Sequence, residues 1–126
     1  MDLSNKKILI CDDSVLARKQ LIDAVNLYSE NATFLEGKNG VEAVELFKTE
    51  NPDLIFMDIV MPEKDGTEAL SEIKAINPDA LIIIVSSVGT QEQLKKAIQL
   101  GARDFIQKPF EKSQIKEILE IHFGGQ

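Results

Sequence analysis

Polar side chains able to do chemistry follow the short apolar runs of this sequence. There are five of them: Asp12, Asp13, Asp58, Ser86 and Lys108. Brought together, three carboxylates would repel one another, by about 3 kcal/mol per pair at ~5 Å and an effective dielectric near 20. A site built from them therefore needs positive charge, and the lysine supplies only part of it.

A divalent cation is the natural complement of this set. Hard carboxylate oxygens suit Mg²⁺ (or Mn²⁺), which binds one or two carboxylates, several waters and a substrate phosphate. An aspartate can also act as a nucleophile toward phosphorus and form an acyl phosphate. The residue types therefore indicate a site that holds a metal and receives a phosphoryl group.

Apolar patterning predicts the elements that must position these side chains. Continuous apolar runs rich in β-branched residues are typical of strands buried on both faces, whereas stripes at three- and four-residue spacing predict amphipathic helices. The expected strands are 8–11, 33–36, 54–57, 81–85 and 104–107. The expected helices carry the stripes Ala17 to Tyr28, Ala43 to Phe47, Ala69 to Ile76, Leu94 to Ile98 and Ile115 to His122.

Proline and glycine mark the joints between these elements. The Asn51-Pro52 and Asn77-Pro78 pairs stand where a helix must end, because the residue before proline disfavours the α region. Gly101 is expected to act as the C-cap of the fourth helix.

Strict alternation of strand and helix predicts one α/β domain over residues 1–126, a doubly wound parallel sheet of five βα units. In such a sheet, ligands bind outside the carboxyl ends of the strands. The five polar side chains should therefore meet at one edge.

The chain resembles the CheY-like receiver domain of two-component response regulators. The matching pieces are Asp12-Asp13, Met57-Asp58-Ile59-Val60-Met61-Pro62 with Asp65-Gly66, Ser86, and Lys108-Pro109-Phe110. Together, in this order and at strand ends, they are highly specific and span nearly the whole chain. The resemblance implies a flavodoxin-like (βα)5 sheet of order 2-1-3-4-5.

The resemblance also implies a role for each residue of the acidic group. Asp58 is expected to be the phosphoacceptor. Asp13 would bind Mg²⁺ directly and Asp12 mainly through water, with Asp58 and the backbone carbonyl of Val60 as further metal ligands.

The remaining residues are expected to sense the phosphoryl group. Ser86 and Lys108 would each bind one of its oxygens, with a cis Lys108–Pro109 bond holding the lysine over the site. Phe105 would be the aromatic switch, turning inward when Ser86 moves toward the phosphate; the alternative is that Phe105 is simply a core residue.

Two positions depart from the common family pattern. Serine replaces the frequent threonine at position 86, and the switch aromatic lacks a hydroxyl because it is Phe105 rather than tyrosine. Val60 and Val88, near the expected phosphate, are apolar and cannot orient an attacking water, so we expect slow self-dephosphorylation.

The function implied is a signalling switch rather than an enzyme. A sensor kinase's phosphohistidine, or a phosphotransfer protein, would phosphorylate Asp58, and a target protein would read the surface of the fourth helix, fifth strand and fifth helix. One alternative is an Mg²⁺-dependent aspartyl phosphohydrolase, which needs a second acid where Val60 stands. A flavodoxin-type flavin protein is another, but Asp12 and Asp13 would repel the flavin phosphate.

Composition narrows the choice further. The chain has 126 residues, and 14 basic against 21 acidic residues give a net charge of −7, which argues against a nucleic-acid binder. No apolar run reaches the ~20 residues of a membrane span, and there is no signal-peptide pattern. Cys11 is the only cysteine, so a cytoplasmic location is expected. Four residues follow His122, which leaves open a free-standing regulator or a receiver cut from a longer protein.

Three of the residues near the end of the first strand also have plain structural interpretations. Asp12 and Asp13 could cap the helix that follows them. Cys11 is expected to be a small buried hydrophobe.

Overall fold

The fold is an α/β sandwich of three layers. The computed structural model describes residues 1–87 and 90–124. Its strands are β1 (Lys7–Cys11), β2 (Thr33–Gly37), β3 (Leu54–Met57), β4 (Ile82–Ser86) and β5 (Asp104–Gln107). Its helices are α1 (Val15–Tyr28), α2 (Gly40–Glu50), α3 (Gly66–Ile76), α4 (Gln91–Gln99) and α5 (Lys112–Phe123).

The five strands form one parallel sheet in the order β2-β1-β3-β4-β5. This confirms the expected fold class and strand order. In the register, Cys11 at the end of β1 pairs with both Gly37 and Met57. The first three strands therefore end level with one another, and the residues that follow them start from the same edge.

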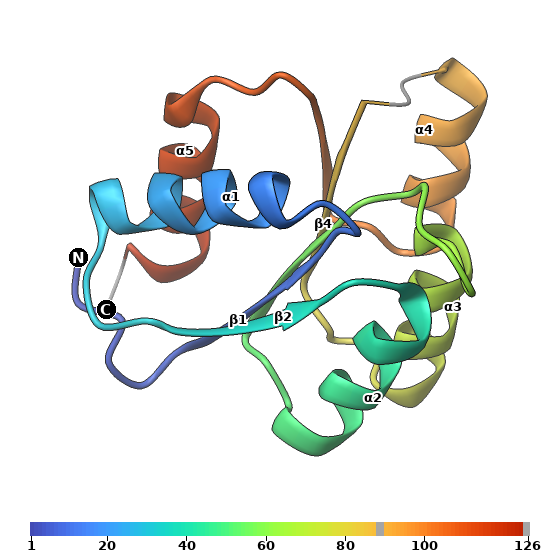
Figure 1. The fold of residues 1–126 in the computed structure, drawn as a ribbon, viewed down its shortest axis with the longest axis horizontal. Coiled ribbons are helices and arrows are strands. Elements are labelled where there is room, and N and C mark those ends of the chain that lie inside the picture. The colour runs from blue at the N-terminus through green and yellow to red at the C-terminus, as the bar shows by residue number, and fades with distance from the viewer. Residues whose placement is uncertain (88–89, 125–126) are drawn as a thin grey trace.

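Helices cover both faces of the sheet. Figure 1 shows α1 and α5 lying together on one side, with α2, α3 and α4 on the other. Burial follows the same division. One apolar cluster joins the sheet to α1 and α5, and a second joins it to α2, α3 and α4.

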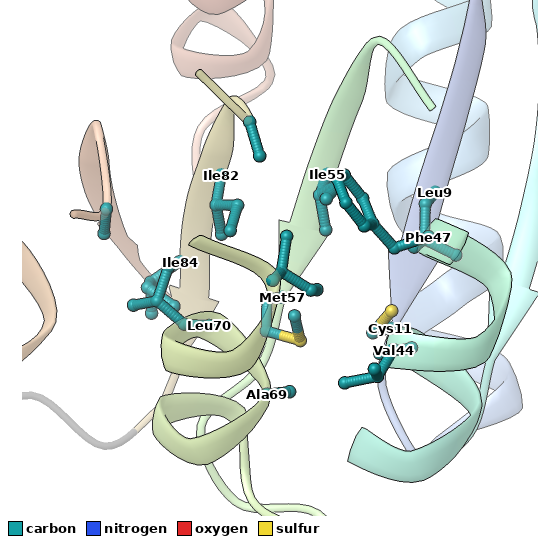
Figure 2. Close-up of a cluster of buried hydrophobic side chains, with 14 of the residues drawn as sticks. Leu9, Cys11, Val44, Phe47, Ile55, Met57, Ala69, Leu70, Ile82 and Ile84 are labelled. Atoms are coloured by element: carbon teal, nitrogen blue, oxygen red, sulfur yellow. The ribbon is translucent and has the colours of Figure 1, made fainter. Parts of the chain in front are cut away.

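The second cluster shows how consecutive strand residues serve both faces. Leu9, Cys11, Ile55 and Met57 point toward α2 and α3, where Phe47 meets them (Figure 2). The residues between them in sequence pack on the opposite side, against α1 and α5. Strands buried on both faces read as unbroken apolar runs for this reason.

Element boundaries differ from the sequence prediction by one or two residues. The strand expected at 81–85 spans Ile82–Ser86, so Ser86 belongs to β4 itself. Leu100, not Gly101, is the C-cap of α4; Gly101 follows it with a φ of 110°, a left-handed conformation that suits glycine.

Helix capping leaves the aspartates of the first loop free for other contacts. The Oγ atom of Ser14 accepts the Ala17 N–H at 3.1 Å and caps α1. Asp12 instead accepts the Ser14 N–H at 2.9 Å. The capping interpretation of Asp12 and Asp13 is therefore wrong, because the serine beside them is the N-cap.

No helix within residues 1–87 and 90–124 is both long enough and apolar enough to cross a bilayer.

Candidate functional site

Three carboxylates converge at the carboxyl edge of the sheet. Asp12 follows β1, Asp13 lies next to it, and Asp58 follows β3; each offers an oxygen within 4.8 Å of the other two. Asp12 and Asp58 are buried, with 2% and 8% of their surface exposed, whereas Asp13 faces solvent. The convergence predicted from the strand ends is confirmed.

Lys108 joins this cluster from the loop after β5. Its Nζ lies 2.5 Å from Oδ2 of Asp12 and 3.2 Å from Oδ2 of Asp58. Burial lowers the pKa of this ammonium, but the hydrogen bond to Asp12 and the charge of Asp58 outweigh burial and raise the pKa above its ordinary value. The lysine is therefore a permanent cation at neutral pH, and the cluster keeps an excess of two negative charges.

The second oxygen of Asp58 is also held by the protein. Its Oδ1 accepts the Ser86 hydroxyl at 2.7 Å and the Ile59 N–H at 2.7 Å. Ser86 is completely buried, whereas Phe105 is half-buried against the core cluster on the α4 side. In this structure the hydroxyl of Ser86 already contacts the aspartate.

Backbone contacts fix the loop that carries Asp58. Its N–H donates to the Cys11 carbonyl at 2.9 Å, and the Gly66 N–H donates to the Ile59 carbonyl at 2.7 Å. A Cβ on Gly66 would lie 1.9 Å from the Asp58 carbonyl oxygen, so only glycine fits there. The peptide bond between Lys108 and Pro109 is cis.

Arg18 contributes to the site although sequence reasoning did not single it out. From the first turn of α1, its Nη1 donates to the Asp12 carbonyl at 2.6 Å and its Nε to Glu36 of β2 at 2.9 Å. Only 12% of the arginine side chain is exposed. Nothing in the sequence distinguishes it from a solvated helix arginine, because its partners come from β2 and from a backbone atom.

Of the two valines expected near the phosphate, the structure describes only Val60. The side chain of Val60 is 58% exposed and borders the acidic cluster in sequence. Val88 lies outside the described residues.

The donor set fits a magnesium ion. Three hard carboxylate oxygens within 4.8 Å of one another, with one exposed side open to solvent, are the ligand type and open geometry that Mg²⁺ prefers. One lysine cannot balance three carboxylates, and a divalent cation could supply the remaining charge. In a parallel α/β domain this carboxyl edge is the place where ligands bind, so the cluster marks the fold's ligand site.

Comparison with known proteins defines the family. The sequence model of the response regulator receiver domain matches residues 8–120. The chain is 45% identical over 114 residues to the chemotaxis protein CheY of Halobacterium salinarum, covering 90% of this chain and 93% of that protein. It is 43% identical over 113 residues to CheY of Bacillus subtilis, with the same coverage of 90% and 93%.

Solved structures of similar fold are also response regulator domains. The CheX–CheY complex with BeF₃ and Mg²⁺ from Borrelia burgdorferi matches with a TM-score of 0.85 and 31% identity, covering 92% of this chain and 88% of that one. The response regulator domain of Thermotoga maritima CheB matches with a TM-score of 0.78 and 34% identity, covering 92% of each. The chain belongs to the response regulator receiver family and is a CheY-like receiver domain.

Proposed function

We propose that Asp58 is the phosphoacceptor of this receiver and takes its phosphoryl group from the phosphohistidine of a sensor kinase or phosphotransfer protein. One observation carries the proposal. Asp58 is a buried carboxylate whose oxygens contact Lys108 and Ser86 while two further carboxylates lie within 4.8 Å. Partly buried carboxylates this close together repel one another and destabilise the fold. A bound cation would offset that repulsion and would also attract an incoming phosphoryl group.

Asp12, Asp13, Asp58 and the Val60 carbonyl would hold Mg²⁺ (or Mn²⁺) at this site. The ion would supply positive charge that balances the carboxylates and the transferring phosphoryl group. The exposure of Asp13 leaves the metal side of the cluster accessible to solvent and to a donor protein.

The protein's own residues would perform the transfer as a simple displacement. An Asp58 carboxylate oxygen forms the new bond to phosphorus as the phosphorus–nitrogen bond of the donor histidine breaks, and the electron pair returns to the imidazole. Lys108 and the Ser86 hydroxyl then turn from the carboxylate to the phosphoryl oxygens that replace it as acceptors. Their present distances of 3.2 Å and 2.7 Å from Asp58 support this exchange of partners.

Phosphorylation would be read on the surface formed by α4, β5 and α5. Phe105 lies in β5, two strand residues from the loop of Lys108, and its half-buried ring would follow the contact between Ser86 and the phosphoryl group. Ile98 of α4 and Ile121 of α5 are 46% and 71% exposed and offer apolar contact to a protein target. The Borrelia relative, solved with CheX, shows that a CheY can be bound by another protein.

The protein would act as a switch rather than as an enzyme with turnover. It would do so in the cytoplasm. Val60 supports a role as a switch, because an aspartyl phosphohydrolase needs an acid at this position to activate water. It also supports a long-lived phosphoaspartate.

Intact-mass spectrometry after incubation with acetyl phosphate tests the acceptor. We expect one added phosphoryl group in the wild type with Mg²⁺ and none with EDTA. Asp58→Asn should gain none, whereas Asp79→Asn, an exposed carboxylate at the opposite edge, should behave as the wild type. Phosphorylation that persists in Asp58→Asn would overturn the assignment.

A further inference from the structure

A second concave site lies at the amino edge of the sheet, opposite the carboxylate cluster. It is a groove of about 640 Å³ between the starts of β3, β4 and β5 and the end of α5. Its basic lining residues are Lys6, Lys74, Arg103 and His122. None of the residues assigned to phosphoryl transfer lies in it.

The groove is enriched in cations although the protein is acidic. Three of its twelve lining residues are lysine or arginine, whereas the whole chain has 14 such residues in 126. Its two acidic residues, Asp53 and Asp79, match the chain average of 21 in 126. The positive charge is therefore concentrated here against the net charge of the molecule.

Contacts with the protein hold both lysines of the groove in place. The aliphatic stem of Lys74 crosses Gly101, where an added Cβ would lie 2.8 Å from Cε, and its Nζ donates to the Pro78 carbonyl at 2.9 Å. The Nζ of Lys6 lies 5.4 Å from the centroid of the Phe123 ring. Both ammonium groups keep donors to spare, since each has three and neither forms an ion pair within the described residues.

The guanidinium of Arg103 acts on the neighbouring imidazole of His122. Burial lowers the pKa of His122 first, and the nearby guanidinium of Arg103 lowers it further, with Asp104 opposing more weakly. Within residues 1–87 and 90–124, Arg103 has no ion-pair partner. Its exposed guanidinium therefore keeps its donors available to an anion in the groove.

We propose that this groove binds a small organic phosphate, a phosphate ester or polyphosphate of nucleotide size, through Arg103, Lys6, Lys74 and His122. The proposal is independent of the phosphoacceptor site and adds a second ligand site at the other edge of the sheet. The volume lies within the range of about 300–1,000 Å³ typical of small-molecule sites. The largely polar lining suits a phosphate rather than an apolar ligand, and Arg103 can form paired hydrogen bonds to phosphate oxygens.

The only histidine of the chain makes the test direct. The ring of His122 gives a single resolvable NMR signal, since the sequence holds one histidine. ATP, pyrophosphate and inorganic phosphate would be titrated separately in EDTA, which keeps the carboxylate cluster metal-free. We expect saturable shifts of this signal and a raised pKa of His122 in the bound protein, strongest for the ligand with most phosphates.

Two charge-matched variants separate a site from general electrostatics. Arg103→Gln should weaken binding by about tenfold, the loss of one charge-assisted phosphate contact. Lys19→Gln, which removes one charge from the exposed face of α1, should leave the affinity unchanged. Equal weakening in both variants would overturn the proposal, as would absence of saturation by about 10 mM of every ligand. Binding of inorganic phosphate as tight as that of ATP would overturn the organic-phosphate assignment.

Discussion

Arg18 shows how one side chain outside the carboxylate cluster fixes part of it. Asp12 has every polar group engaged: its N–H meets the Gly37 carbonyl at 3.0 Å, its carboxylate meets Ser14 and Lys108, and its carbonyl meets Arg18. The arginine therefore positions the loop that carries two of the proposed metal ligands, Asp12 and Asp13.

Replacing Arg18 by alanine should lower the free energy of unfolding by about 1–3 kcal/mol, because the buried Asp12 carbonyl loses a charged donor. Mg²⁺ affinity should fall as well, since the loop of Asp12 loses its anchor. Urea unfolding and magnesium calorimetry would measure the two effects. Lys19→Ala, one residue further along α1 and exposed, should change neither. Unaltered Mg²⁺ affinity in a destabilised Arg18→Ala would reduce the arginine to a purely structural role.

Two glycines contrast in how the elements approach each other. A Cβ on Gly66, the first residue of α3, would meet the Asp58 carbonyl oxygen at 1.9 Å. On Gly37, at the end of β2, the nearest atoms would be 3.4 Å away, an ordinary contact. The start of α3 thus packs directly on the strand end that carries Asp58.

Gly66→Ala should destabilise the fold by about 1–3 kcal/mol through overpacking and displace the Asp58 loop. Its rate of phosphorylation by acetyl phosphate should fall more than its stability alone explains. Chemical denaturation and mass spectrometry would follow both properties. Gly37→Ala is the matched control and should retain near wild-type values; a similar loss in the two variants would contradict the packing argument.

Asp65 links the same helix to pH. It caps α3 by accepting the Glu68 N–H at 2.9 Å and the Thr67 hydroxyl at 2.8 Å. Burial alone would raise the pKa of this carboxyl, but the hydrogen bonds outweigh burial and lower it below its ordinary value of 3.8. Its contribution to stability is complete above pH 3.8 and is lost as pH falls through the lowered pKa.

Asp65→Ala should therefore cost about 1 kcal/mol at neutral pH through loss of the cap. Asp65→Asn keeps an acceptor but cannot titrate. Its stability difference from the wild type should change as the pH falls from about 5 to about 2, and in favour of the variant. Thermal unfolding across that range measures it. A constant difference would show that the carboxylate does not titrate against folding.

Helices and strands can be predicted well where the residues of the element itself carry a clear apolar pattern. The apolar run of residues 54–57 predicts the bounds of β3 to the residue, since a strand buried on both faces leaves a continuous signal. The bounds of β5 also agree, although only Ile106 of that strand is buried and its apolar signal is weaker. The alternative that Asp12 and Asp13 cap α1 could not be excluded from the sequence, because aspartate and serine are both good caps. The structure excludes it, since Ser14 caps the helix and Asp12 contacts Lys108.

In the whole molecule, too, some features of the site could be predicted from the sequence and others depend on tertiary contacts. Its convergence could be predicted, because parallel topology brings the ends of β1, β3 and β4 together. Arg18 and the basic groove could not, since they depend on side chains from distant elements meeting across the sheet edge. Lys6 and His122 are 116 positions apart by their numbers and share one groove.

Stability and function oppose each other at the carboxylate cluster. Asp13 is exposed, and its side chain has no hydrogen bond or ion pair within the described part of the chain, yet its carboxylate lies within 4.8 Å of two others. Without a cation it adds repulsion that nothing local offsets.

Asp13→Asn should therefore raise the free energy of unfolding in EDTA by about 1 kcal/mol, a value reduced by solvent screening. Mg²⁺ should stabilise the wild type by about 1.4 kcal/mol at ten times its dissociation constant, and the variant much less. Urea unfolding with and without Mg²⁺ measures all four values. Glu45→Gln, an exposed change of the same charge on α2, controls for net charge and should keep the full metal response. If Asp13→Asn unfolds more easily than the wild type in EDTA, the carboxylate serves folding, and the opposition between stability and cation binding is refuted.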